Sequence, residues 1–184
     1  MEYLDVVDEA GEPVGRRVER AEAHARGILH RTSHLWVARR REGAVEVLLQ
    51  LRAAAKESYP GRYDVSSAGH IPAGAGFVDS ALRELREELG LEADASELVP
   101  CGVRRIHRRE TFGGRPFVDN QVSRVFLLWR DVDEAKVRFQ RSELDGVRWM
   151  RLDECIEAVR RHSIPTCIDP EELEMVAAVA APIA

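Results

Sequence analysis

The sequence predicts an α/β fold in which a mixed β-sheet lies between helices on both of its sides. Short apolar or alternating runs typical of strands recur along the chain, and a few amphipathic stretches typical of helices interrupt them. Turn residues separate these segments, and apolar residues make up 45% of the chain, enough for a packed core. At 184 residues the chain suits one domain, residues 1–184.

The first part of the chain contains two predicted β-hairpins with a short polar helix between them. The hairpins span residues 3–19 and 34–52, and the second one turns at Gly43. The helix spans residues 19–27 and ends at Gly27, which is placed as a C-cap. The first hairpin is therefore an addition in front of the main sheet.

The second half of the chain alternates between predicted strands and helices. The strands span residues 97–110, 117–130 and 147–152, and the middle one has the clearest alternation of apolar and polar side chains. A helix over residues 153–162 follows. A last helix begins at Asp169-Pro170, where an N-cap residue precedes a proline in the first turn.

Charge and composition exclude several classes of protein. A net charge of −5 argues against binding a nucleic-acid polymer through bulk electrostatics. Three scattered cysteines without a CxxC pair argue against a disulfide framework and favour a reducing compartment, so we expect a cytoplasmic location. The acidic N-terminus does not resemble a signal peptide, and no apolar run reaches the ~20 residues that a membrane span needs.

One predicted helix carries three glutamates whose spacing points to a metal. Glu84, Glu87 and Glu88 stand at offsets of zero, three and four, which place their side chains on one face. Such crowding costs ~0.2–0.5 kcal/mol for each like-charged pair on a helix surface. Mg²⁺ or Mn²⁺ would offset that cost, because both prefer carboxylate oxygens. A solvated acidic face is the alternative.

The segment around this helix, GHIPAGAGFVDSALRELREELGL over residues 69–91, resembles the Nudix box, G-x5-E-x7-R-E-U-x-E-E-x-G-U, where U is a bulky aliphatic residue. A strand-like run, a glycine-rich loop and the acidic helix follow one another, and only Ala75 departs from the pattern, in place of its first glutamate. The residues that fit are Gly69, Arg83, Glu84, Leu85, Glu87, Glu88, Gly90 and Leu91. The resemblance implies a single Nudix domain with an α/β/α sandwich fold, to which the N-terminal hairpin is added.

The resemblance also implies the residues of the site. Glu84, Glu87 and Glu88 would bind Mg²⁺, or Mn²⁺, together with the backbone carbonyl of Gly69. One of these glutamates would instead act as the base, and the catalytic candidates are Glu87 and Glu88. Glu143 is a third candidate, because many Nudix hydrolases keep an acidic residue in such a loop; a solvated loop acid is the alternative.

Ala75 leaves the motif arginine, Arg83, without the partner that the family pattern implies. Asp79 lies four residues before Arg83 on the same helical face, so we expect it to replace the missing glutamate. Arg83 is also a candidate for substrate binding.

The segment before the box resembles that of isopentenyl-diphosphate isomerases and the Nudix hydrolases most similar to them. Arg52 and Lys56 match two cations that bind the substrate diphosphate in that group. The isomerases carry a catalytic cysteine and a glutamate where this chain has Ala68 and Gln121. Neither an alanine nor an amide supplies the acid or base that isomerisation needs, so these two residues favour hydrolysis.

Two further groups of polar residues stay open to more than one interpretation. His24, His30 and His70, with Asp119, partly resemble a second metal site of the isomerases, although the spacing matches poorly; hydrogen bonding is the alternative. The basic run over residues 104–109 either touches substrate or is a solvated strand end.

The sequence therefore predicts an Mg²⁺-dependent enzyme that cleaves a diphosphate linkage in a nucleoside diphosphate derivative or a related X-diphosphate. An isopentenyl-diphosphate isomerase and a non-catalytic nucleotide-binding module are the alternatives. The expected partner is a small molecule rather than a nucleic acid or a membrane, and a homodimer is among the oligomeric states left open.

Overall fold

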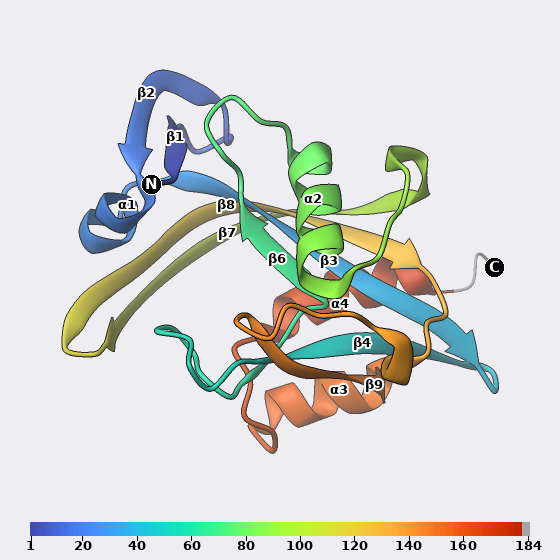
Figure 1. The fold of residues 1–184 in the computed structure, drawn as a ribbon. Coiled ribbons are helices and arrows are strands. Elements are labelled where there is room, and N and C mark those ends of the chain that lie inside the picture. The colour runs from blue at the N-terminus through green and yellow to red at the C-terminus, as the bar shows by residue number, and fades with distance from the viewer. Residues whose placement is uncertain (182–184) are drawn as a thin grey trace.

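The computed structural model describes residues 1–181 and contains one large sheet, one small sheet and four α-helices (Figure 1). The strands are β1 Tyr3–Val7, β2 Pro13–Glu19, β3 His30–Arg41, β4 Ala44–Arg52, β5 Tyr63–Asp64, β6 Ser67–His70, β7 Leu98–Phe112, β8 Arg115–Trp129 and β9 Leu144–Arg151. The helices are α1 Arg20–Arg26, α2 Phe77–Leu89, α3 Leu152–Arg160 and α4 Pro170–Ala180, with short 3-10 turns at Ala95–Glu97 and Glu134–Lys136.

The large sheet has seven strands, and its pairing is mixed. The path runs β5-β4-β3-β8-β7, with β6 paired to β3 and β9 paired to β4. Strands β3 and β8 run parallel, whereas the other pairs are antiparallel. This confirms the predicted α/β class with a mixed sheet. The first hairpin, β1–β2, forms a separate two-stranded sheet, as expected.

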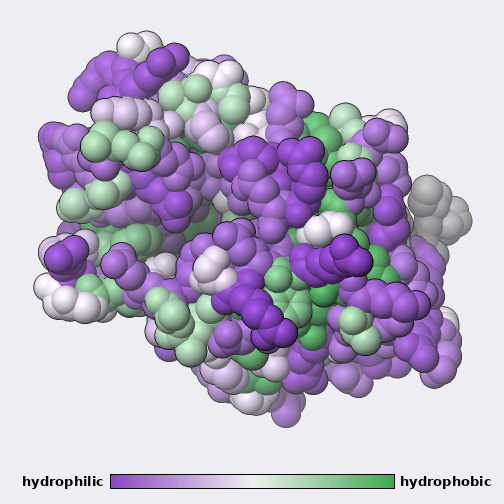
Figure 2. All heavy atoms as spheres, in the orientation of Figure 1, coloured by the Kyte–Doolittle hydropathy of each residue, from purple (hydrophilic) through white to green (hydrophobic). Residues whose placement is uncertain are grey.

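Helices cover both faces of the large sheet (Figure 1). On one face α2 packs through Ala81, Leu85 and Leu89 against apolar side chains of β3, β4 and β8. On the other face α3 and α4 pack against a second cluster that includes Trp36 and Leu127. Hydrophilic side chains cover most of the surface seen in Figure 2. No helix among the described residues is long and apolar enough to span a bilayer.

Local signals located several boundaries correctly. Gly27 and Gly90 end α1 and α2 in the left-handed conformation, with φ of 64° and 66°, which a glycine adopts without strain. Asp169 is the N-cap residue of α4, but its side chain does not cap the helix. Strand β3 begins at His30, four residues before the predicted strand, because pairing with β6 and β8 extends it.

Candidate active site

The acidic helix α2 lies beside strand β6, and Gly69 is the point of closest approach. A Cβ atom at position 69 would lie 2.3 Å from Cδ of Glu84, so the strand accepts the carboxylate only because residue 69 is glycine. One turn further along α2, a carboxylate oxygen of Glu88 accepts a hydrogen bond of 3.2 Å from the backbone N–H of Ala68. The structure therefore brings together Gly69, Glu84 and Glu88, three of the predicted metal-binding residues.

Glu87 lies at the outer side of this group. Its side chain is 48% exposed, compared with 16% for Glu84. The guanidinium of Arg83 joins the two, donating to Glu84 at 2.7 Å and to Glu87 at 3.0 Å. Its Nη2 also lies 3.5 Å from the carbonyl oxygen of His70. Arg83 thus fixes the two carboxylates relative to the strand.

The prediction that Asp79 forms an ion pair with Arg83 is wrong. Within residues 1–181, the partners of the Arg83 side chain are Glu84, Glu87 and the carbonyl of His70. Asp79 lies exposed in the first turn of α2. The i,i+4 rule allows Arg83 to reach either Asp79 or Glu87. Arg83 pairs with Glu87, because its guanidinium also bonds Glu84 and lies against the carbonyl of His70.

Burial changes the acidity of two of these carboxyl groups. It raises the pKa of Glu84, an effect that Arg83 opposes and the neighbouring Glu87 reinforces. Burial likewise raises the pKa of Glu88 to about 8, although the hydrogen bond from the Ala68 amide favours the ionised form. Two partly buried carboxylates beside a strand backbone are hard oxygen donors that suit a divalent cation.

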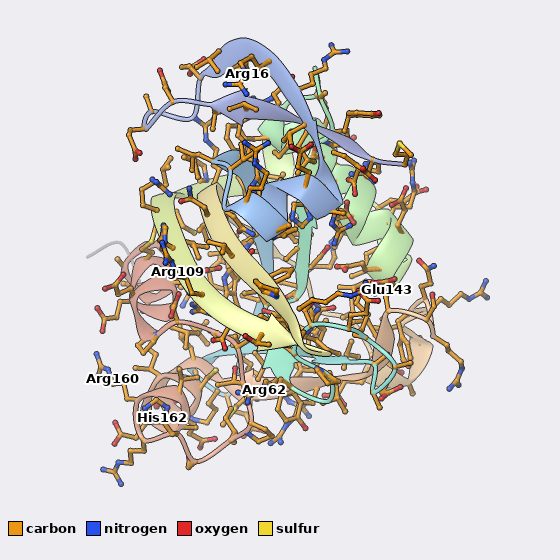
Figure 3. All side chains as sticks on the ribbon, turned by 90° about the vertical axis from the view of Figure 1, so that its left-hand side faces the viewer. Arg16, Arg62, Arg109, Glu143, Arg160 and His162 are labelled. Carbon is orange, nitrogen blue, oxygen red and sulfur yellow. The ribbon has the colours of Figure 1, made fainter. Side chains whose placement is uncertain are left out.

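The predicted substrate-binding segment of Arg52 and Lys56 meets the loop that carries Glu143, the third candidate base. Lys56 forms an ion pair with Glu143, and the backbone N–H of Ala53 donates to the Glu143 carbonyl at 2.9 Å. The same loop reaches α2, because the N–H of Gln140 donates to the carbonyl of Glu88 at 3.2 Å. Figure 3 shows Glu143 on the α2 side of the molecule.

Arg52 is more deeply held than Lys56. Its guanidinium donates to Asp64 at 3.0 Å and twice to the carbonyl of Ser58, at 3.0 and 3.2 Å. Burial opposes the charge of Arg52, but Asp64 outweighs that effect and raises the pKa. Arg52 therefore also organises the loop that carries Lys56.

Three histidines come together in spite of their irregular spacing. His24 comes from α1, His30 from the start of β3 and His70 from the end of β6, and each can direct one ring nitrogen into a common centre. The Nε2 atoms of His24 and His70 lie 2.9 Å apart, while the buried Nε2 of His30 has no hydrogen-bond partner among the described residues. The poor spacing therefore does not argue against a metal site.

Contacts at the other ring nitrogens orient two of these imidazoles. Nδ1 of His30 lies 2.8 Å from the carbonyl oxygen of Ile28, so the N–H donates there. Nδ1 of His24 lies 3.3 Å from the carbonyl of Val118 and 3.5 Å from Asp119. Burial lowers the pKa of all three histidines, that of His24 to about 4, which keeps the rings neutral. Neutral imidazoles are ligands for Zn²⁺ and related ions.

The positions that distinguish an isomerase lie beside this cluster. Ala68 and Gln121 belong to β6 and β8, the two strands that flank β3. The amide of Gln121 accepts from the hydroxyl of Thr32 at 3.1 Å and donates to Asp119. The amide is therefore fixed as a hydrogen-bonding group, and Ala68 in β6 offers only a methyl group.

Sequence reasoning missed a buried ionic network on the opposite face of the sheet. The carboxylate of Glu172 in α4 accepts from Trp36 at 2.8 Å and from His34 at 2.9 Å, and it pairs with Arg104. Asp169 pairs with Arg104 and Arg108. Two members of the basic run thus anchor α4, whereas Arg109 projects outward from the β7–β8 hairpin in Figure 3. The sequence signal for this network was the alternation with period two, which places Arg104, Ile106 and Arg108 on one face of β7.

With this geometry in place, comparison with known proteins defines the class. The family model described as a NUDIX domain matches residues 29–167. The chain therefore belongs to the Nudix family and is a hydrolase of the pyrophosphohydrolase type. The matched range begins after the N-terminal hairpin and α1.

Individual relatives support the assignment. An uncharacterised Nudix hydrolase of Clostridium acetobutylicum is 33% identical over 153 residues, covering 83% of this chain and 71% of that protein. An isopentenyl-diphosphate Delta-isomerase of Cereibacter sphaeroides is 30% identical over 145 residues, covering 79% and 76%. A crystal structure from Deinococcus radiodurans has a similar fold, with a TM-score of 0.74, 20% identity and coverage of 94% and 98%.

Proposed function

We propose that this protein uses Mg²⁺ or Mn²⁺ to hydrolyse the diphosphate linkage of a nucleoside diphosphate derivative or a related X-diphosphate. The observation that carries the proposal is the position of Glu84 and Glu88 against the backbone of β6. A carboxylate pair of this kind, next to a corner with two cations, suits a substrate whose phosphates need both a metal and positive side chains.

The donor set fits a hard divalent cation. Glu84, Glu87 and Glu88 would hold it with the carbonyl of Gly69, and Arg83 keeps the first two carboxylates in place. When bound, the cation neutralises phosphate charge and lowers the pKa of a bound water. The raised pKa of Glu84 and Glu88 reflects the cost of two buried negative charges, which a cation would offset.

The side chains near the metal site divide the remaining work. Arg52 and Lys56 would contact the phosphate oxygens, and Arg83 is the third candidate for that contact. Glu87, Glu88 and Glu143 are the candidate bases for the attacking water. Because Lys56 and Glu143 are paired, a phosphate that takes over Lys56 would release the Glu143 carboxylate to accept a proton.

Hydrolysis and isomerisation leave different isotopic signatures. The purified protein would be given nucleoside diphosphates, nucleoside triphosphates, dinucleotides and prenyl diphosphates with Mg²⁺ or Mn²⁺. Reaction in ¹⁸O-labelled water should put the label into a phosphate product. Deuterium incorporation into a prenyl carbon in D₂O, with no phosphate release, would instead establish an isomerase, in conflict with Ala68 and Gln121.

We also propose that His24, His30 and His70 hold a second, transition-metal ion, with Asp119 beside them. The support is the convergence of three imidazoles, two of them buried and that of His70 partly buried, and the unpartnered Nε2 of His30. A metal at this position would tie α1 to β3 and β6. Its presence is independent of the hydrolase assay, since metal content can be measured directly.

We place the protein in the cytoplasm, with a small-molecule diphosphate as its partner. Three free cysteines, one of them buried, support a reducing compartment.

A further inference from the structure

The glycine-rich loop between β6 and α2 has lost the side chain that the motif places at position 75. Helix α2 begins after Gly76, which provides no side-chain cap. This loop nevertheless determines where α2 starts, and so where Glu84 and Glu88 lie relative to Gly69. Some other group must hold it.

The group that holds the loop comes from the N-terminal hairpin. Oδ2 of Asp5, in β1, accepts a hydrogen bond of 2.7 Å from the backbone N–H of Gly74. The same oxygen accepts from Nη2 of Arg31 at 3.2 Å, and that Nη2 also donates to the carbonyl of Ala75 at 3.1 Å. One ion pair therefore binds an N–H and a C=O of two consecutive loop residues and closes a ring with the backbone.

The ion pair is shielded from water and is embedded in further contacts. The side chains of Arg31 and Asp5 are 10% and 11% exposed. The hairpin also meets the loop through its backbone, since the N–H of Ala73 donates to the carbonyl of Tyr3 at 2.8 Å. Charge-assisted hydrogen bonds in such a site are stronger and better defined than those on an open surface.

The Asp5–Arg31 pair acts as a clamp on the loop, and this clamp extends into the first turn of α2. The guanidinium of Arg31 lies 5.3 Å from the ring centroid of Phe77, the first helical residue, and that of Arg124 lies 4.6 Å from it. A movement of the Asp5–Arg31 pair would therefore shift both the loop and the start of the helix that carries the glutamates.

We propose that Asp5 and Arg31 are positioning residues of the hydrolase, and that Asp5, from another segment of the chain, holds the loop in which Ala75 replaces the motif glutamate. Asp5 lies in the hairpin, outside the range 29–167 that matches the family model, so the added hairpin is part of the catalytic apparatus. The role in turnover rests on the proposed hydrolysis, whereas the role in holding the loop does not.

Two substitutions at Asp5 separate its functions. Asp5→Asn keeps an oxygen acceptor for Gly74 but removes the charge opposite Arg31, and Asp5→Ala removes both. Glu12→Gln is the matched control, because Glu12 is exposed in the same hairpin and its side chain forms no hydrogen bond or ion pair within residues 1–181.

Kinetics should be measured well below the melting temperature of every variant. We expect kcat to fall at least tenfold in Asp5→Ala and less in Asp5→Asn. The Mn²⁺ concentration for half-maximal rate should rise more in Asp5→Ala than in Asp5→Asn, while the substrate KM of both variants stays unchanged. The Glu12→Gln enzyme should have wild-type values throughout. A purely structural role would lower only the melting temperature. If Asp5→Ala fails to fold, Asp5→Asn alone decides.

Hydrogen exchange provides a readout that does not depend on turnover. The amide of Gly74 should exchange at least tenfold faster in Asp5→Ala, which removes its acceptor, and by a smaller factor in Asp5→Asn, which keeps an oxygen acceptor but loses the charge. The amides in the middle of α2 should stay unchanged. Unaltered exchange at Gly74, or wild-type kcat and Mn²⁺ dependence in folded Asp5→Ala, would overturn the inference. An inactive wild-type enzyme with faster exchange in the variant would instead refute the proposed function and leave the loop clamp intact.

Discussion

The Nε2 atoms of His24 and His70 lie 2.9 Å apart, although 46 residues separate the two histidines in the chain. Two neutral imidazoles cannot both direct a lone pair at the other, so one of these nitrogens must carry a proton or both must face a cation. The buried and unpartnered Nε2 of His30 beside them favours the cation.

This relationship leads to a prediction about metal content. The wild-type protein, after dialysis against EDTA and reloading, should retain about one transition-metal ion per chain. His30→Ala should lose that ion, because it removes one of three nitrogen donors. Elemental analysis measures the result, with the exposed His107→Gln as control. Equal metal content in wild type and His30→Ala would show that the cluster is held by hydrogen bonds.

The second prediction concerns the acidic helix. Glu87→Gln should lower kcat by about 100-fold or more while the melting temperature stays near that of the wild type, because the residue is half exposed and serves as a metal ligand rather than a core group. Initial rates with saturating Mg²⁺ provide the measurement. The control is Glu92→Gln, just beyond the end of α2. Full activity in Glu87→Gln would show that the metal assignment is wrong.

The third prediction concerns Lys56. Lys56→Met should raise the substrate KM by roughly tenfold, since a charge-assisted hydrogen bond to phosphate contributes ~1.5–3 kcal/mol. It also frees the carboxylate of Glu143, which Lys56 otherwise pairs with. A double-mutant cycle with Glu143→Gln therefore distinguishes the contact of Lys56 with phosphate from its pairing with Glu143. Additive effects on kcat/KM would mean that the pair does not act as a unit in the reaction.

The fourth prediction concerns stability and pH. Burial disfavours the ionised form of Glu172, but His34, Arg104 and Trp36 outweigh that effect and lower its pKa to about 2. A carboxyl group with a depressed pKa contributes stability above its unfolded pKa near 4.5, and that contribution is lost as the pH falls from 4.5 toward 2. Wild-type protein should therefore lose stability over this range.

Glu172→Gln isolates that contribution. At pH 7 it should reduce the free energy of unfolding by about 3–5 kcal/mol, because Arg104 loses its buried partner. Below pH 3 the difference from wild type should shrink. Urea titrations at several pH values measure both effects, with the neighbouring exposed Glu171→Gln as control. A difference that stays constant with pH would contradict the ionic origin.

The elements themselves were accessible from local sequence, because the signals for them are local. Alternation located β8, and Gly27 ends α1 in the left-handed conformation that its predicted C-cap position favours. The offsets of Glu84, Glu87 and Glu88 similarly place the three carboxylates on one helix without knowledge of the fold. The partner of Arg83 was missed because the helical rule permits two neighbours and does not choose between them.

The sequence by itself determined the acidic helix, the glycine at position 69 and the absence of isomerase groups at Ala68 and Gln121. Only the tertiary structure decided what surrounds them: the meeting of His24, His30 and His70, the burial of Glu172, and the clamp of Asp5 and Arg31 on the loop around Ala75. The physical reason is that these contacts join segments far apart in the chain. Their geometry depends on strand pairing across the sheet, which no local spacing encodes.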